Sequence, residues 1–269
     1  MPVVDALSRH DTVVLVPVLN EEKAITAFLE RWSGFEWDLM VLDGMSRDGT
    51  VSLVEAFQAR EVGSSVRLIR TREPQGLAYN TCVGLEAALA AGYGYIIVAD
   101  AGTQQPQDAQ TMLRAARRDA GSARVIPRGS YFLRGSHVHD FPTYRRVVTF
   151  AAALVSRLLL GRTGTYPTHA FKVWPRAALE AIPFRGLVDG SVAQCRNGPE
   201  FQVGMTWLSL QHGWRVVEFP MVFHGTKSTF RWRWIPGFLR ETLHLRGYRP
   251  ASVEAAQTSL SGSIAEAEG

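Results

Sequence analysis

The first half of the chain alternates between short apolar segments and longer amphipathic ones, and this alternation restricts the fold more than any other feature. The apolar segments predict strands over residues 12–18, 37–43, 66–70, 95–100 and 123–127. Helical spacing of apolar residues predicts helices over 20–32, 50–60, 76–92 and 106–119. Continuous apolar strands that alternate with helices are typical of a parallel sheet covered on both faces. The sequence therefore predicts an α/β fold with a doubly wound, mostly parallel sheet and helices on both faces.

The second half of the chain is less regular. It predicts helices over 144–161 and 200–213, the second ending at Gly213 in a left-handed cap, and strands over 170–174 and 214–223. The last strand contains a proline, which favours an edge position. Residues 230–249 are basic and aromatic, and the residues after them contain no lysine or arginine. We expect a main domain over 1–229, a basic aromatic helix over 230–249 and a disordered tail over 250–269.

Composition limits the class of partner. Of the 269 residues, 46% are hydrophobic and 20% are charged, which is enough for a large globular core. A net charge of +4 suits phosphate-bearing ligands or an anionic membrane face and does not indicate nucleic acid. Cys82 and Cys195 lie in no Cys-x-x-Cys spacing, so we expect buried thiols in a reducing compartment. The sequence shows no signal-peptide pattern and no window long enough to span a bilayer, so a cytoplasmic location is expected.

Residues that follow the strands are the first candidates for function, because ligands of such sheets bind beyond the carboxyl ends of the strands. After the first strand, Asn20 is placed to cap a helix, and Glu21 favours the positive end of that helix. Asp43 ends the second strand and can accept hydrogen bonds from a ribose or a base. Ser46 and Asp48 lie in the polar turn that follows, and Asp48 is interpreted as a structural cap.

The stretch VADAGTQQP, residues 98–106, ends the fourth strand and offers one carboxylate, Asp100, and one amide, Gln104. Mg²⁺ and Mn²⁺ take oxygen ligands, and a nucleotide diphosphate can supply several of them. Asp100 and Gln104 could therefore hold a metal weakly; the alternative is a plain strand-end turn. The sequence HVHD, residues 137–140, lacks a further zinc ligand nearby, so no zinc site is expected there. No Gly-x-Gly-x-x-Gly follows the first strand, which disfavours a dinucleotide enzyme.

Three strand-end motifs together resemble the family 2 glycosyltransferases with a GT-A fold. They are Pro-x-x-Asn-Glu from Pro17, Asp-Gly-x-Ser-x-Asp-Gly-Thr from Asp43, and Asp-Ala at Asp100. The likeness is greatest to the dolichol- or polyprenyl-phosphate mannose synthases. It is carried further by AFKVWPRAAL and by EFQVGMTWLSLQHGWRVVEFPMVFHGTKS, and it covers about residues 12–230.

The resemblance implies a nucleotide-diphosphate sugar as donor, Mg²⁺ or Mn²⁺ on its diphosphate, and polyprenyl phosphate as acceptor. By position, Asp100 and Gln104 would be the metal ligands. The catalytic set would consist of Asp100, Arg145, Arg146 and Lys227, the last three as phosphate contacts. The residues expected to bind the nucleotide sugar are Pro17, Leu19, Asn20, Glu21, Asp43, Ser46, Gly76, Asp100 and Ala101.

This sequence departs from the family pattern at several polar positions. Gly102 stands where a second metal-binding Asp is expected, Tyr166 where an Asp is usual, and Gly204 where a Glu is usual. These departures leave three functions open: an inverting glycosyltransferase with a phosphate acceptor, the same donor class with a soluble small-molecule acceptor, or a non-catalytic nucleotide-sugar-binding protein. A phosphate acceptor is favoured, because it is already an anion and requires no strong general base. The basic aromatic segment suits either peripheral contact with the inner membrane face or packing on its own domain.

Overall fold

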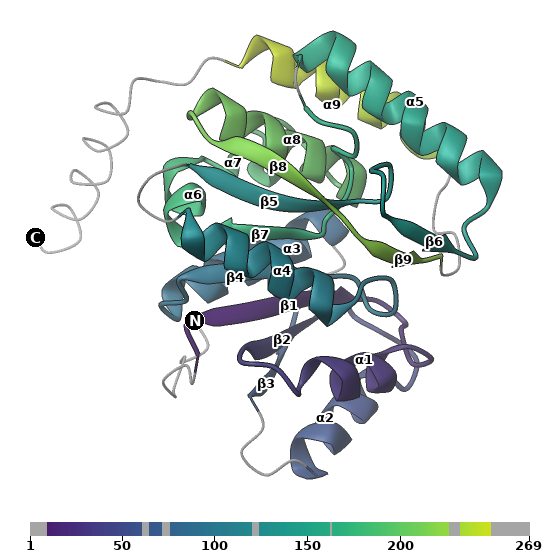
Figure 1. Cartoon of the computed structure of the whole chain (residues 1–269), viewed down its shortest axis with the longest axis vertical. Helices are drawn as coiled ribbons and strands as arrows, with labels where there is room; N and C mark the ends of the chain where they lie inside the picture. Colours follow the sequence, from purple (N-terminus) through teal and green to yellow (C-terminus); the bar gives the residue numbers. More distant parts are fainter. Residues whose placement is uncertain are drawn as a thin grey trace, which may run out of the picture.

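The computed structural model describes residues 10–60, 65–71, 76–119, 124–161, 163–225 and 232–248. A seven-stranded sheet lies at the centre (Figure 1). Its strands are β1 (Thr12–Val18), β2 (Asp38–Asp43), β3 (Val66–Arg70), β4 (Tyr95–Val98), β5 (Val125–Ser130), β7 (Lys172–Pro175) and β8 (Arg215–Pro220). Their order is β3-β2-β1-β4-β7-β5-β8. All neighbours are parallel except β7, which is antiparallel to β4 and β5. The predicted mostly parallel α/β sheet is confirmed, and the proline-containing β8 lies at its edge.

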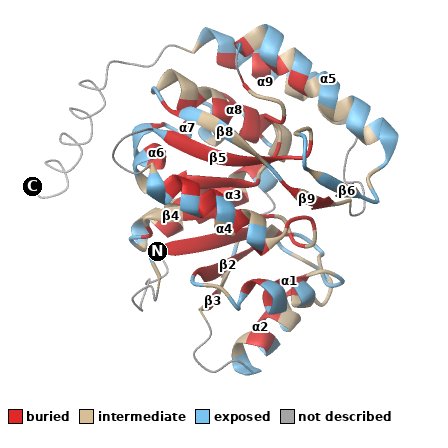
Figure 2. Cartoon of the chain, in the orientation of Figure 1, coloured by how far each residue is buried: buried red, intermediate tan, exposed pale blue. Residues whose placement is uncertain are grey.

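Helices cover both faces of this sheet. The first face carries α1 (Ile25–Trp32), α2 (Thr50–Arg60) and α4 (Pro106–Arg118); the other carries α3 (Leu77–Ala90), α6 (Arg176–Ala181), α7 (Gly186–Asp189) and α8 (Gly198–Gln211). Successive residues of β1 point to opposite faces, so Val13 packs with α3 and Val14 packs with α1. Because both sides of such a strand are buried, its sequence is apolar throughout, and Figure 2 shows the buried strands between the outer helices.

Two further helices form a layer outside α8. They are α5 (Thr143–Leu160) and α9 (Ile235–Gly247), which contact each other and lie side by side in Figure 1. The short helix η1 (Trp232–Trp234) precedes α9. The Nε1 of Trp207 in α8 donates a hydrogen bond of 2.8 Å to the carbonyl of Leu245, which anchors α9 on the domain. A separate pair of short parallel strands, β6 (His137–His139) and β9 (Val222–His224), lies beyond the ends of the sheet strands.

The element boundaries show where local rules succeeded and failed. The first helix begins at Ile25 rather than Asn20, which has a φ of 58° and cannot cap it. The segment predicted as one strand over 214–223 forms two strands, β8 and β9, which belong to different sheets. Gly213 has a φ of 77° directly after the end of α8, which confirms the predicted left-handed cap.

Three further predictions concern the cysteines, a membrane-spanning helix and the C-terminal part of the chain. Cys82 and Cys195 are buried and free, as expected. Among the described residues, no helix is both long enough and apolar enough to cross a membrane. Lys227 and the predicted tail over 250–269 lie outside the described residues.

Candidate functional site

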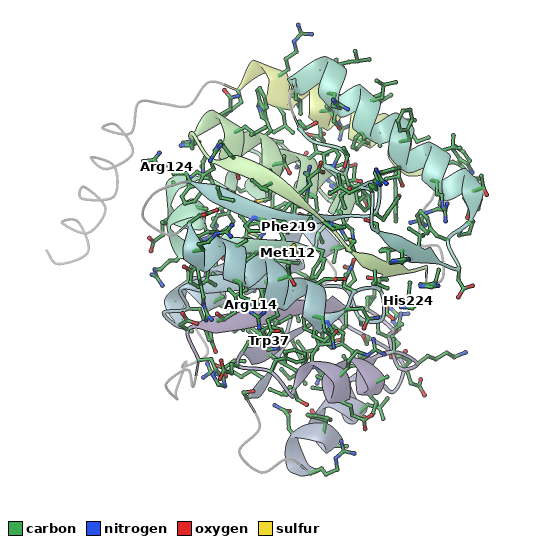
Figure 3. All side chains as sticks on the ribbon, in the orientation of Figure 1. Trp37, Met112, Arg114, Arg124, Phe219 and His224 are labelled. Carbon is green, nitrogen blue, oxygen red and sulfur yellow. The ribbon has the colours of Figure 1, made fainter. Side chains whose placement is uncertain are left out.

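The candidate residues come together at one edge of the sheet. Strands β1, β2 and β4 are parallel, so their carboxyl ends meet there, and the register pairs Val18 with Asp43. This edge can be found in Figure 3 from two labelled residues. His224 of β9 lies on the side where these strands end, and Arg124, just before β5, lies on the opposite side. Residues 19–21, 43–46 and 100–101, predicted from the motifs, lie at or just after the ends of strands that meet at this edge.

The end of β2 opens into a pocket of about 440 Å³. It is lined by Asp43, Met45, Ser46, Arg47, Arg70 and Thr71. The Asp43 side chain is buried at this position and accepts a hydrogen bond of 3.1 Å from the Ser46 backbone N–H. The Nε of Arg70 lies 3.9 Å from the other carboxylate oxygen. A fixed carboxylate beside two arginines can bind a group that combines hydroxyls with negative charge.

The loops after β1 and β2 hold each other in place. The Asn20 side-chain oxygen accepts a hydrogen bond of 2.8 Å from the Arg47 N–H, and the Asn20 N–H donates one of 2.9 Å to the Ser46 hydroxyl. Asp48 accepts hydrogen bonds from the N–H groups of Thr50, the first residue of α2, and Glu22, which confirms its structural role. Asn20 is therefore part of a clasp between two loops, and its predicted helix cap was wrong because this distant partner takes its side chain.

Asp100 is held by a side-chain clamp. Its backbone N–H donates a hydrogen bond of 2.6 Å to the Oε1 of Gln104, and the Gln104 Nε2 donates one of 3.2 Å back to the Asp100 Oδ2. The intervening Gly102 has a φ of 88°, a conformation that an aspartate adopts only with strain. Gly102 thus permits the turn that folds Gln104 onto Asp100. The role of Gln104 as a metal ligand stays a prediction, since its amide atoms already engage Asp100.

Two carboxylates at this edge, those of Glu21 and Asp100, have raised pKa values. Burial raises the pKa of Glu21, and the charges of Asp100 and Asp48 raise it further. Burial also raises the pKa of Asp100, against the hydrogen bond from Gln104 and the charge of Lys172. A bound cation would relieve the repulsion that the charge of Asp100 exerts on Glu21. Within the described part of the chain no three His, Cys, Asp or Glu side chains converge as a metal site, so a divalent ion here would need ligand oxygens as well.

An aromatic pair packs behind the clamp. The His169 Nε2 lies 3.3 Å from the Gln104 Nε2, and the His169 ring stacks on Tyr166 with ring centroids 4.4 Å apart. Burial, with the charge of Lys172 in addition, lowers the pKa of His169 to about 3. His169 is therefore neutral near pH 7, and its Nε2 can accept the Gln104 hydrogen bond. Tyr166, which stands where the family has an acid, now serves as a wall of this apolar support.

Two buried charged residues and one partly buried one, which the motifs did not identify, complete the support. Lys172 is fully buried and donates hydrogen bonds to the His169 carbonyl and, at 2.7 Å, to Gln202. Arg128 is also fully buried and forms an ion pair of 2.7 Å with Glu218. Glu218 in turn accepts hydrogen bonds from the N–H groups of Thr165 and Tyr166. A charged residue inside an apolar strand, such as the lysine of AFKVW, is the signal that could have found them.

The remaining predicted residues are distributed around this centre. Arg145, in the first turn of α5, lies over the Phe141 ring at 5.5 Å, and Arg146 is exposed. Ala101 is buried, Pro17 is partly buried and Leu19 is exposed.

At two positions, 76 and 204, a residue larger than glycine would clash with its neighbours. Gly76 has a φ of 92°, and a Cβ there would lie 2.6 Å from the Arg196 carbonyl. A Cβ on Gly204 would lie 2.7 Å from the Leu187 side chain, so position 204 points into the core beside α7.

Ligands of an open α/β sheet bind beyond the carboxyl ends of its parallel strands, which is where these acidic side chains lie. Residues 13–153 match the model of Glycosyl transferase family 2. The chain belongs to this family, and its class is therefore that of a glycosyltransferase.

Relatives support this assignment. The undecaprenyl-phosphate mannosyltransferase of Micrococcus luteus is 28% identical over 78% of this chain and 82% of its own length. The polyprenol monophosphomannose synthase of Mycolicibacterium smegmatis is 28% identical over 79% of this chain and 77% of its own length. The glucosyl-3-phosphoglycerate synthase of Mycobacterium tuberculosis, solved with Mn²⁺, UDP and its product, shares the GT-A fold. Its TM-score is 0.60 at 19% identity, covering 91% of this chain and 82% of that one.

Proposed function

We propose that this protein is an inverting glycosyltransferase that moves a hexose from a nucleotide-diphosphate sugar to polyprenyl phosphate at the cytoplasmic face of the membrane. The observation that carries the proposal is the Asp100 carboxylate, which Gln104 clamps at the same sheet edge as the Asp43 pocket. The choice of acceptor is supported by the Micrococcus and Mycolicibacterium relatives, whose names refer to undecaprenyl phosphate and polyprenol.

The pocket at the end of β2 is the proposed nucleoside site. The Asp43 carboxylate would accept hydrogen bonds from ribose or base, with Pro17 and Leu19 against the ring. Asn20 and Ser46 would act by holding the two loops that form the site, through the hydrogen bonds between them. Gly76 would belong to the wall of the same site, where only a glycine fits its backbone conformation.

The Asp100 carboxylate fits a divalent ion whose other ligands would be oxygens of the donor diphosphate. When bound, Mg²⁺ or Mn²⁺ supplies positive charge that stabilises the departing diphosphate. Asp100 would hold the ion in the orientation set by Gln104, while Ala101 would back the sugar phosphate. Gln104 would then act as a positioning residue, in line with the engagement of its amide by Asp100.

Transfer requires one bond to form and one to break at the anomeric carbon. A lone pair of an acceptor phosphate oxygen forms the new bond on the face opposite the diphosphate, which leaves with the electrons of the old bond. Because the acceptor is already an anion, no side chain has to remove a proton. Arg145 and Arg146, at the start of α5, are proposed to bind phosphate groups. Lys227 is proposed for the same role, although it lies outside the described residues.

The test is a transfer assay with separate donors and acceptors. GDP-mannose, GDP-glucose, UDP-glucose and UDP-galactose are each incubated with Mn²⁺ and either undecaprenyl phosphate or 3-phosphoglycerate, with Asp100→Asn as control. We expect a lipid-extractable sugar from one donor, and its loss in the variant. Transfer only to the soluble phosphate would replace the acceptor class. No transfer with any pair, despite donor binding, would indicate a non-catalytic sugar-nucleotide binder.

A further inference from the structure

Helix α5 exposes an apolar stripe that the fold leaves uncovered. Val147 is 62% exposed, Phe150 60% and Leu158 74%, and Tyr144 and Leu154 are exposed beside them. At about 100° per residue, these five positions fall within about a third of the helix circumference. The opposite side of α5 is buried through Ala153, Ser156 and Leu160. The stripe is thus the outer face of a helix whose opposite side is buried at these three residues, and Figure 2 shows α5 as largely exposed.

Helix α9 continues this surface. Its exposed apolar residues, with those of η1, are Trp232, Ile235, Leu239 and Leu243. Since α5 and α9 contact each other, the two stripes lie on neighbouring helices of the same outer layer (Figure 1). We call the nine exposed apolar residues of α5, η1 and α9 the α5–α9 face. Exposed apolar residues that gather on neighbouring elements can mark an interaction surface.

The charges around the α5–α9 face identify the kind of partner. Helix α5 contains no acidic residue, and its exposed arginines include Arg146 and Arg157. The acid of α9, Glu241, is buried and pairs with Arg240, whose side chain is 66% exposed. An apolar face bordered by arginines, without exposed carboxylates on either helix, matches an anionic lipid surface. A second copy of the chain would bring the same positive charges against each other.

A continuous line of side chains joins the first turn of α5 to the candidate site. It starts at α5 and runs through Arg145, Phe141, Tyr131, Tyr166, His169, Gln104 and Asp100, with each pair in ring or hydrogen-bond contact. Five side chains therefore connect Arg145, in the first turn of α5, to Asp100. A phosphate at a bilayer surface beneath this face would lie on the same helix as Arg145 and Arg146, the arginines proposed to bind phosphate.

We infer that the α5–α9 face docks on the surface of an anionic bilayer and places the strand-end site beside it. This inference rests on the proposed function for the acceptor that the bilayer supplies, but the docking itself can be measured separately. The apolar side chains enter the headgroup region, and the bordering arginines meet lipid phosphates. Binding then combines apolar burial with a salt-sensitive electrostatic contribution.

The test compares the full chain with two variants in cosedimentation with phosphatidylcholine vesicles, with and without phosphatidylglycerol. Val147→Glu with Leu158→Glu places charge on the α5–α9 face. Val217→Glu makes the same kind of change on β8, away from that face, where Val217 is 38% exposed. We expect about tenfold or greater loss of binding to anionic vesicles for the first variant and little change for the second. Binding of the wild type should fall when salt is added.

Three further results decide the inference. Nucleotide-sugar binding and transfer to a short, water-soluble prenyl phosphate should be unchanged in Val147→Glu/Leu158→Glu, while transfer to undecaprenyl phosphate in vesicles falls. Equal vesicle binding by all three proteins, or none by the wild type, would overturn the docking surface while leaving the proposed function intact. A wild-type dimer that becomes monomeric in the variant and binds no vesicles would assign the face to self-association instead. Vesicle binding without any transfer would leave the docking surface in place and contradict only the proposed function.

Discussion

The buried ion pair between Arg128 and Glu218 gives the sharpest stability prediction. Arg128 has no exposed surface and the Glu218 side chain is only 13% exposed, with 2.7 Å between the paired atoms. Burial alone would raise the pKa of Glu218, but Arg128 and the N–H groups of the Thr165 loop outweigh it and lower that pKa. The substitution Glu218→Gln keeps the shape and a hydrogen-bond acceptor and removes the charge. It leaves the Arg128 guanidinium buried without a counterion.

Removing one member of a buried pair costs about 3–5 kcal/mol. For a chain of this size, that loss lowers the melting temperature by on the order of 10 °C. The matched control is Glu180→Gln, because Glu180 pairs with Arg176 at the same distance of 2.7 Å but at the surface. We expect the control to lose less than about 1 kcal/mol.

Urea unfolding and calorimetry of both variants measure this difference, and a double variant tests its cause. Arg128→Met combined with Glu218→Gln removes the uncompensated charge, so it should be more stable than Glu218→Gln alone. If Glu218→Gln costs no more than Glu180→Gln, the pair does not fix the loop that carries Tyr166 and His169, and our explanation of the support behind Asp100 fails.

Three other predictions concern the site and its support. Gln104→Ala should weaken Mn²⁺-dependent nucleotide-sugar binding by about 10- to 100-fold, because it removes the partner that orients Asp100. An unchanged affinity in titration calorimetry would contradict the clamp at Asp100. Gly204→Glu introduces the acid that is usual in the family, and its clash with Leu187 should destabilise the fold by about 1–3 kcal/mol without raising activity. A variant that is as stable in urea unfolding and more active in transfer assays would refute this. The folded-state pKa of His169, about 3, lies below the unfolded value of about 6.5, so the unfolded chain takes up this proton first and stability falls as the pH drops between these values. At about pH 5 the wild type should therefore have lost about 2 kcal/mol more than His169→Gln relative to neutral pH, and parallel pH–stability curves would contradict a buried neutral imidazole.

The sheet could be predicted from the sequence because burial on both faces produces continuous apolar strands. Residues 12–18 and 66–70 form strands with the expected bounds. The direction of β7 could not be predicted, since an apolar pattern such as AFKVW is the same for a parallel and an antiparallel strand. The pattern also showed that residues 144–161 form an apolar helix, but not which of its faces stays uncovered.

The candidate site was only partly predictable because its polar contacts join residues far apart in the chain. The motifs identified Asp43 and Asp100, whose place at strand ends follows from the fold class. The clasp between Asn20 and Ser46 spans 26 residues, and the contact between Gln104 and His169 behind the clamp spans 65. Local rules therefore assigned Asn20 to a helix cap, and they gave no partner for the charge of Lys172.

The central claim is that Asp100 holds a nucleotide-diphosphate sugar at this edge through a divalent ion. The most direct measurement is thermal unfolding of the wild type and Asp100→Asn with GDP, UDP and their sugar conjugates, each with Mn²⁺ and with EDTA. Ligand at about 100 times its Kd should stabilise the wild type by about 2.7 kcal/mol. We predict such a shift for one nucleotide class, lost in EDTA and in Asp100→Asn. A wild type that no nucleotide stabilises, or a shift that persists in both EDTA and the variant, would contradict the claim.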